Sequence, residues 1–211
     1  MRNSKVLAII TASAVALSSV GVAHAMSGKK KSPVPGKPGT ATIVQTAIAV
    51  NQQTGEFDYL LAAATCDYFD GAVVDLLNGT DMYTLFAPTD AAFETLIPAL
   101  IGLDLLPPGT PVEPASLCKL DSGVLFNVLA YHVTDGRRFS NSVFNRRNVK
   151  MIEMLNGQYI VTNPNLTIND NAGQTVKVVP TLELNDGKEI GAVNVNASNG
   201  VVHVINKVLL P

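Results

Sequence analysis

Apolar residues recur at helical spacing through the first half of the chain. In residues 57–64 they fall at positions i, i+3, i+4 and i+7, which predicts a helix with one buried face. The same spacing predicts a short helix over residues 73–77 and two further helices, each preceded by residues that favour the N-terminal cap position. The candidate caps are Thr89 or Asp90 for the first of these two helices, and Asp121 or Ser122 for the second.

The second half of the chain has the pattern of short strands. After about residue 148, runs rich in Val, Ile, Thr and Tyr alternate with turn sequences, of which Asn156-Gly157 and Asp186-Gly187 are typical of two-residue hairpins. Residues 82–87 and 200–210 are further predicted strands. A chain in which the helices come first and most strands come last is typical of an α+β fold. Residues 42–50 are short, apolar and partly β-branched, so their pattern fits either a helix or a strand.

The N-terminal region has the features of an export signal. Arg2 and Lys5 precede an uncharged, mostly apolar run over residues 6–22, and Ala23-His24-Ala25 follows as a small-x-small cleavage site. This pattern predicts a secretory signal peptide over residues 1–25. The alternative is a membrane anchor, since roughly 17 mostly apolar residues nearly suffice to span a bilayer. We expect a mature chain without a transmembrane segment, secreted to the cell exterior or to the periplasm.

Residues 26–40 predict a flexible linker. Residues 27–40 hold four Lys among several Pro and Gly, and their one large apolar residue, Val34, cannot supply a core. A solvated spacer is the simpler interpretation, and a basic arm that touches an anionic surface is the alternative. A folded domain over residues 41–211 is expected to follow.

The charge of this domain argues against a nucleic-acid partner. The whole chain has a formal charge of −2, and from residue 41 on nine basic residues stand against 17 acidic ones, which gives −8. Such a balance offers no basic footprint for a phosphate backbone. A local basic excess predicts a contact with an anionic polysaccharide or phosphate, and a solvated surface with local ion pairs is the alternative. It consists of Arg137, Arg138, Arg146 and Arg147.

The sequence contains no recognisable set of catalytic or metal-binding residues. Two Cys cannot form a four-thiolate site, and His132 and His203, the two His after the leader, fall short of the three protein ligands that catalytic zinc usually has. Nucleophile-elbow and phosphate-loop motifs are also missing. We therefore expect no catalytic residue, no metal and no cofactor. Both His are interpreted as buried hydrogen-bonding groups, with a metal ligand or a general base as the alternative.

The two Cys of an exported chain predict a disulfide between Cys66 and Cys118. Cys66 ends the first predicted helix, and Cys118 precedes the helix that begins near Ser122, so both lie beside elements that must share one small core. Export places them in an oxidising compartment. The alternative is two buried free thiols.

Three segments resemble the signature segments of the fasciclin domain. They are T-L-F-A-P-T-D-A-A-F over residues 84–93, L-A-Y-H-V over residues 129–133 and N-G-V-V-H-V-I over residues 199–205, in the family's order. The resemblance covers about residues 42–211. It implies a single fasciclin-like domain in which a β-sandwich wedge packs beside several helices, and it favours a helix for residues 42–50. The Pro-rich insert between residues 100 and 120 departs from the simplest family pattern.

The residues that carry the resemblance are candidate structural or binding residues. Within them, Thr89 and Asp90 are interpreted as caps of the helix that follows, with a catalytic Asp90 as the alternative. The full set is Thr84, Phe86, Pro88, Thr89, Asp90, Phe93, Tyr131, His132, Asn199, Gly200, His203 and Ile205.

The resemblance implies a secreted, non-enzymatic module that binds or adheres to cell-surface or matrix proteins or polysaccharides. A minority of relatives are water-soluble carotenoid binders, so a carrier of a lipophilic small molecule is the alternative. Residues 96–108 carry more apolar side chains than one helical face needs. Core packing is the favoured explanation of such a stretch, and the wall of a groove is the alternative. An enzyme is the third and least favoured function.

Overall fold

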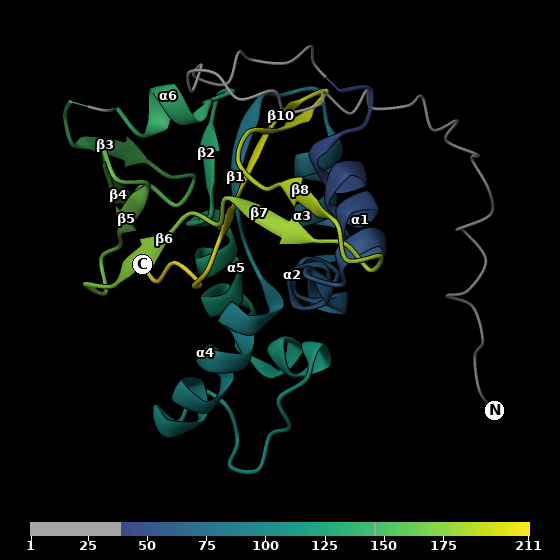
Figure 1. Ribbon diagram of the computed structural model, residues 1–211. Coiled ribbons are helices and arrows are strands. Elements are labelled where there is room, and N and C mark those ends of the chain that lie inside the picture. Colours follow the sequence, from purple (N-terminus) through teal and green to yellow (C-terminus); the bar gives the residue numbers. More distant parts are fainter. Residues whose placement is uncertain (1–38, 146) are drawn as a thin grey trace. The chain divides into compact units, whose positions relative to one another are not determined.

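The computed structural model describes residues 39–145 and 147–211 (Figure 1). The predicted signal peptide, most of the predicted linker and Arg146 lie outside the described residues. The helices are α1 (Ile43–Thr54), α2 (Asp58–Ala64), α3 (Ala72–Asn78), α4 (Asp90–Gly102), α5 (Ser122–Ala130) and α6 (Ser140–Val143), with 3₁₀ turns at Asp67–Phe69 and Pro114–Lys119. Among the described residues, no helix combines the length and the apolar character that crossing a membrane requires.

The strands form two four-stranded sheets and a separate hairpin. The first sheet has the order β2 (Val133–Asp135), β1 (Tyr83–Pro88), β10 (Gly200–Ile205), β9 (Val195–Ala197). The second has the order β3 (Lys150–Glu153), β4 (Tyr159–Asn163), β5 (Thr167–Asn169), β6 (Thr175–Lys177), and the hairpin pairs β7 (Thr181–Glu183) with β8 (Glu189–Gly191). Strands β1 and β10 are parallel, with Tyr83 opposite Gly200, and the other strand pairs are antiparallel.

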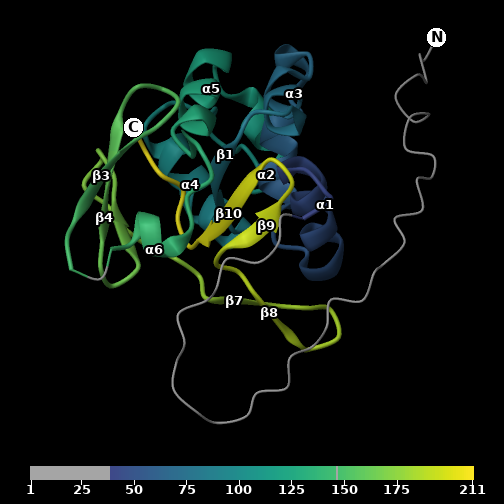
Figure 2. The same ribbon diagram turned by 90° about the horizontal axis from the view of Figure 1, so that it is seen from above.

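Strands β1 and β10 lie between two apolar layers. In Figures 1 and 2, helices α1 to α3 lie on one side of this pair and strands β3 to β6 on the other. Neighbouring residues of a strand face opposite sides of the sheet. Leu85 and Val204 accordingly pack into the helical core, while Phe86 and Ile205 pack into the core of the sandwich. Burial on both faces explains why these two strands are nearly continuous apolar runs.

The predicted α+β order is confirmed, and the ambiguous segment at residues 42–50 is a helix. Thr42 caps α1: its hydroxyl accepts from the backbone N–H of Gln45, and the Gln45 side chain accepts from the backbone N–H of Thr42. One predicted boundary was too long: the last strand ends at Ile205 rather than at residue 210. Helix α5 ends at Ala130, so that His132 lies just beyond it.

The two predicted hairpins exist, but their loops have three residues instead of two. After β3, the backbone N–H of Met154 donates to the oxygen of Gln158, and Gly157 adopts a left-handed φ of 81°. The loop of the β7–β8 hairpin closes in the same way, between Leu184 and Lys188, with Gly187 at φ 79°. A turn followed by a left-handed Gly is the usual three-residue connection, and Asn-Gly or Asp-Gly satisfies it as well as the two-residue form.

Candidate functional site

Asn199 joins two helices to the end of the first sheet. Its buried side chain accepts from the backbone N–H of Ile43 at 2.8 Å and donates to the carbonyl oxygens of Leu77 at 2.8 Å and Gly79 at 2.9 Å. These groups belong to the start of α1 and the end of α3, where helix geometry leaves backbone groups without partners. At the next residue, Gly200, a Cβ atom would collide with the backbone oxygen of Tyr83 and the side chain of Ile43. This signature pair therefore holds α1, α3, β1 and β10 together.

Replacing Asn199 with Ala is expected to lower the free energy of unfolding by about 3 kcal/mol or more, because three hydrogen-bonded backbone groups lose their partner at once. Urea denaturation followed by circular dichroism measures the change. Asn148→Ala, at an exposed position, is the control and should stay within about 0.5 kcal/mol of the parent. Equal denaturation midpoints for Asn199→Ala and the parent would contradict the assigned role.

Asp90 does not cap the helix that it begins, which corrects the prediction made for it. Thr89 occupies the N-cap position of α4 without a side-chain hydrogen bond, and the Asp90 carboxylate instead accepts from the backbone N–H groups of Asp58 at 3.2 Å and Tyr59 at 3.0 Å. These two donors belong to the first turn of α2. Burial raises the pKa of Asp90, and the two N–H donors oppose that rise. Asp90 therefore links the starts of two helices that are distant in sequence.

Asp90→Ala is expected to lower the free energy of unfolding by about 2 kcal/mol, since hydrogen bonds to a charged acceptor contribute more than neutral ones. Chemical denaturation measures it. Glu94→Ala is the matched control, because Glu94 is an exposed carboxylate on the same helix. If both variants lose the same small amount of free energy of unfolding, the link between α2 and α4 does not contribute to stability as proposed.

His132 is buried and neutral at the junction of the helical core and the sandwich. Its Nε2 accepts from the backbone N–H of Leu209 at 2.9 Å, so Nδ1 carries the proton and donates to the carbonyl oxygen of Val128 at 2.7 Å. Burial lowers the pKa of His132 to about 4, although Val128 and the nearby Asp170 carboxylate favour the charged form. The neighbouring Tyr131 hydroxyl donates to the carbonyl oxygen of Tyr159 at 2.8 Å, which connects this segment to the second sheet.

His203 has the same character on β10. Its Nε2 is 2.9 Å from the carbonyl oxygen of Arg138, and its Nδ1 accepts from the backbone N–H of Asn194 at 3.4 Å. Burial lowers its pKa to about 4, and the ring of Phe86 stacks on it with 5.7 Å between centroids. Both ring nitrogens are occupied in each His. In the part of the chain that the structure describes, no three His, Cys, Asp or Glu side chains gather to hold a metal ion.

Other signature residues also make contacts inside the fold. The Thr84 hydroxyl donates to the carbonyl oxygen of Gly136 at 2.7 Å and accepts from the backbone N–H of Arg138. Phe93 stacks on Tyr59 with 5.8 Å between ring centroids. Pro88 lies opposite Ile205 at the end of the parallel pair. A role of any of these residues in binding stays a prediction.

Two of the described arginines of the basic cluster, Arg137 and Arg138, already have backbone partners. The guanidinium of Arg137 donates to the carbonyl oxygens of Ala197 and Ser198, each at 2.7 Å, and that of Arg138 donates to the carbonyl oxygen of Asp135 at 2.8 Å. Arg147 is exposed. These bonds leave fewer donors for an anion than four free guanidinium groups would supply, and the anion contact stays a prediction.

The predicted disulfide is confirmed. Cys66 and Cys118 are bonded, with 5.5 Å between their Cα atoms. The bond joins the segment after α2 to the 3₁₀ turn Pro114–Lys119. Helix α2 and this turn pack on each other. It therefore anchors the far end of the Pro-rich insert to the helical core.

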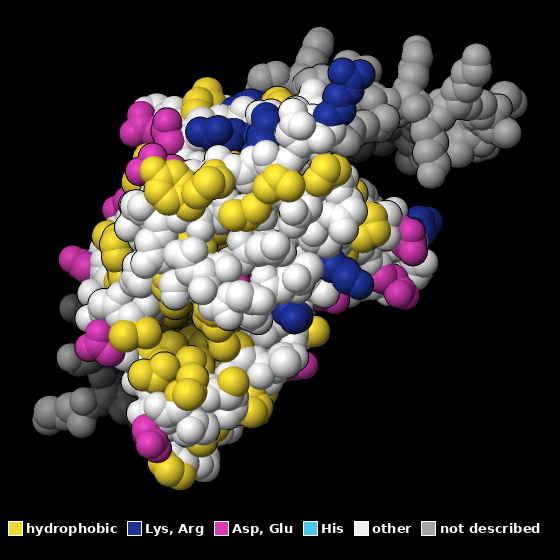
Figure 3. Space-filling view, turned by 90° about the vertical axis from the view of Figure 1, so that its left-hand side faces the viewer, with side chains coloured by type: hydrophobic (Ala, Val, Ile, Leu, Met, Phe, Trp, Pro, Cys, Tyr) yellow, Lys and Arg dark blue, Asp and Glu magenta, His cyan; other side chains and the backbone are white. Residues whose placement is uncertain are grey.

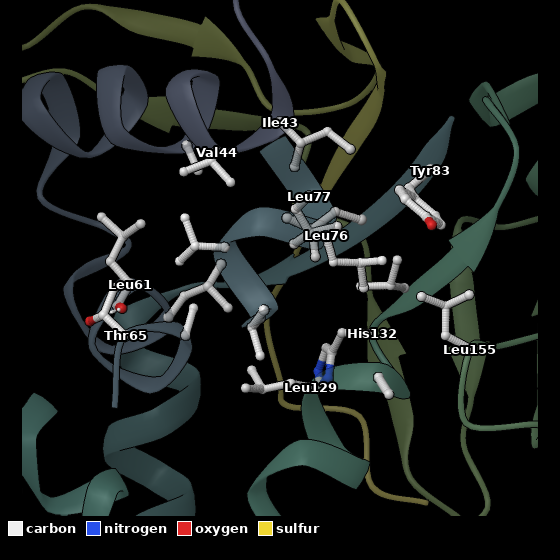
Figure 4. Close-up of a pocket in the computed structure, with 18 of the residues that line it drawn as sticks. Ile43, Val44, Leu61, Thr65, Leu76, Leu77, Tyr83, Leu129, His132 and Leu155 are labelled. Atoms are coloured by element: carbon white, nitrogen blue, oxygen red, sulfur yellow. Dashed lines mark hydrogen bonds between the residues drawn. The ribbon is translucent and has the colours of Figure 1, made fainter. Parts of the chain in front are cut away.

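An apolar cavity of about 360 Å³ opens between α1, α2, α3 and α5. Hydrophobic side chains surround a hollow on one face of the molecule (Figure 3), and the close-up in Figure 4 shows residues of the cavity wall, which come from all four helices and from β1 and β2. Thr65, Tyr83 and His132 are the polar members of this wall. The other residues lining it are Ile43, Val44, Ala47, Ile48, Leu60, Leu61, Ala64, Val73, Val74, Leu76, Leu77, Leu85, Phe126, Leu129, Ala130, Val133 and Leu155.

The floor and the rim of this cavity differ in exposure. Buried residues such as Ile43, Leu85 and Leu129 form the floor. The apolar rim consists of the exposed side chains Ile48, Leu76, Phe126 and Leu155, of which Phe126 is 49% exposed. Large apolar side chains that stay exposed together round a hollow are typical of a recognition surface.

The alternative interpretation of residues 96–108, as the wall of a groove, is wrong for this cavity. Residues 96–108 do not line the cavity: Ile97, Leu100 and Leu106 are buried in the helical core, while Leu103 points to solvent with 69% of its surface exposed. One overlooked signal lies in residues 73–77, where four of five residues are apolar, more than one face of a short helix can bury.

This chain is similar to a known protein family, to a cyanobacterial protein and to a solved structure. Residues 64–211 match the family model described as "Fasciclin domain". "Protein sll1483" of Synechocystis sp. (strain ATCC 27184 / PCC 6803 / Kazusa) is 28% identical over 176 residues, which are 81% of this chain and 73% of that protein. A solved structure of "a FAS1 domain pair from the insect cell adhesion molecule Fasciclin I" aligns over 81% of this chain with a TM-score of 0.47 and 15% identity. The alignment covers 51% of that structure's chain, so the present chain spans about half its length.

Proposed function

This chain belongs to the fasciclin domain family, and on that premise we propose that it works outside the cell as a non-enzymatic module that binds cell-surface or matrix components. The observation that carries the proposal is the cavity with its exposed apolar rim at Ile48, Leu76, Phe126 and Leu155. Such a site can accept apolar side chains of a partner, and the polar surface around it can form the solvent-accessible edge of the interface.

The chemistry of the cavity wall supports binding rather than catalysis. The Thr65 hydroxyl donates to the carbonyl oxygen of Leu61, and both ring nitrogens of His132 are bonded to backbone groups. Among the described residues, this wall offers no nucleophile within reach of a free base. Apolar contact is therefore the main interaction that the cavity can provide.

The test is an adhesion assay with beads that carry the full-length mature protein and with cells or extracellular matrix from its source. The double variant Phe126→Ser/Leu155→Ser removes two rim side chains and is expected to abolish most of the adhesion. Val149→Ser/Met151→Ser is the matched control: these residues are 56% and 68% exposed and lie outside the cavity. Adhesion that survives the rim variant, or that both variants reduce equally, would contradict the proposal.

The volume of the cavity favours a second candidate, a water-soluble carrier of a lipophilic small molecule such as a carotenoid. Ligand pockets generally enclose about 300–1,000 Å³, and about 360 Å³ falls at the lower end of that range. Visible absorbance that stays with the protein through purification from its native source would identify a bound carotenoid. A colourless protein whose organic extract contains no lipid would contradict the carrier function.

A further inference from the structure

The size of the cavity limits what it can enclose. About 360 Å³ falls at the lower end of the range of ligand pockets, so the cavity favours a small guest. An unbranched alkyl chain can lie on the floor formed by Ile43, Leu85 and Leu129.

The charge around the cavity limits the head group of such a chain. No Lys, Arg, Asp or Glu is among the described residues that line the cavity, and His132 is neutral with both nitrogens bonded. The domain from residue 41 on carries −8. Burial raises the pKa of the Tyr83 hydroxyl, and the negative charges of Asp81 and Asp135 raise it further. A carboxylate or phosphate head group would therefore meet negative potential without a cation to pair with.

Tyr83 supplies a hydroxyl in the cavity wall (Figure 4). Within residues 39–145 and 147–211, no hydrogen bond ties this hydroxyl to another side chain or to the backbone, whereas the Thr65 hydroxyl is bonded to the carbonyl oxygens of Leu61 and Ala62. A phenol hydroxyl can both donate to and accept from an alcohol. The wall thus offers one polar contact to an otherwise apolar guest.

From these observations we infer that the cavity takes a small, uncharged, single-chain lipophile with a hydroxyl head, such as a medium-chain alcohol. This inference rests on the proposed carrier function and narrows its ligand class. The alkyl chain packs between α1, α3 and α5, and the head hydroxyl meets Tyr83.

Displacement of the uncharged fluorescent probe N-phenyl-1-naphthylamine from the purified, delipidated protein at pH 7.5 tests the inference. We expect 1-dodecanol to displace the probe, and dodecanoate, with the same chain and a negative charge, to need at least a tenfold higher concentration. Tyr83→Phe should raise the concentration of 1-dodecanol needed for half displacement by about threefold to tenfold, equivalent to one hydrogen bond, and leave probe binding unchanged.

Two helix variants locate the binding site. Ala64→Phe fills the cavity from α2 and is expected to abolish probe binding, whereas Ala99→Phe adds the same side chain at an exposed position of α4 and should have no effect. Circular dichroism and urea midpoints verify that both variants fold. If Ala64→Phe fails to fold, the Tyr83→Phe result still decides the outcome.

The results separate the two levels of the proposal. A parent protein that does not bind the probe would overturn the carrier function itself. Probe binding with equal displacement by dodecanoate and 1-dodecanol would overturn the inferred head group while the carrier function stands. Stoichiometric binding of a forty-carbon carotenoid that 1-dodecanol cannot displace would overturn the inferred size.

Discussion

Lowering the pH from 7.5 to 4 is expected to reduce the free energy of unfolding by about 6 kcal/mol, about 3 kcal/mol for each of His132 and His203. Both rings are neutral in the folded protein, with pKa values of about 4, whereas an unfolded chain has a His pKa of about 6.5. A depressed folded-state pKa gives stability that is fully present above the unfolded value. This stability is lost as the pH falls through 6.5 towards 4.

Protonation is unfavourable because each ring uses one nitrogen as an acceptor. A charged His132 could no longer accept from the N–H of Leu209, and a charged His203 could no longer accept from that of Asn194. Glu56 and Asp90 act in the opposite direction, since burial raises the pKa of both carboxyls and so favours the folded state at low pH. The His contribution should dominate between pH 6 and 5, above the range in which ordinary carboxyls titrate.

Urea denaturation at several pH values between 6 and 5 measures the effect. Two protons taken up on unfolding correspond to a slope of about 3 kcal/mol per pH unit, and His203→Gln should halve it, because a Gln amide can donate and accept like the neutral ring but does not titrate. His132→Gln provides the same comparison at the other site. A slope that neither substitution changes would show that other groups cause the acid sensitivity.

Removing the disulfide is expected to cost about 4 kcal/mol, since the Cys66–Cys118 bond closes a loop of 52 residues in the unfolded chain. That amount is a large share of the roughly 5–15 kcal/mol by which domains are stable. The measurement compares the urea midpoint of Cys66→Ala/Cys118→Ala with that of the parent, and the parent with and without reductant. Because both sulfur atoms of the disulfide lie near the carbonyl oxygen of Ala62, Ala is the replacement that adds no new polar group there.

The reductant separates the bond from the side chains. Reduced parent and double variant should lose similar stability, while the double variant itself should not respond to reductant. A parent whose midpoint is the same in both redox states would contradict the expected contribution. A double variant much less stable than the reduced parent would assign the loss to packing of the Cys side chains instead.

Capping residues and the spacing of apolar residues, which are both local features of the sequence, predicted the helices well. Asp121 accepts from the backbone N–H groups of Gly123 and Val124, as expected of a cap, and the helical period of residues 57–64 corresponds to α2. Asp90 shows where such signals fail. It has the residue type and the position of a local cap, but its donors lie at Asp58 and Tyr59, which only the packing of α2 against α4 brings near.

The cavity could not be predicted from any one segment. Its wall takes a few residues from each of several elements, and the apolar run of residues 96–108 contributes Ile97, Leu100 and Leu106 to the core instead. The hydrophobic pattern of a segment indicates which of its side chains need to be buried. It does not indicate whether the helices and strands that pack on this segment fill the space between them or leave a cavity. The signature residues were easier to find because their residue types are restricted by close contacts, as at Gly200.

The central place of β10 has a consequence for how the chain matures. Strand β1 lies between β2 and β10, and its parallel partner is more than a hundred residues away along the chain. Until residues 200–205 have been synthesised, one edge of β1 keeps its hydrogen-bonding groups open, although all six of its residues are buried in the finished sheet. The first sheet can therefore form only late in the synthesis of this domain, after the other parts of the helical core have been made.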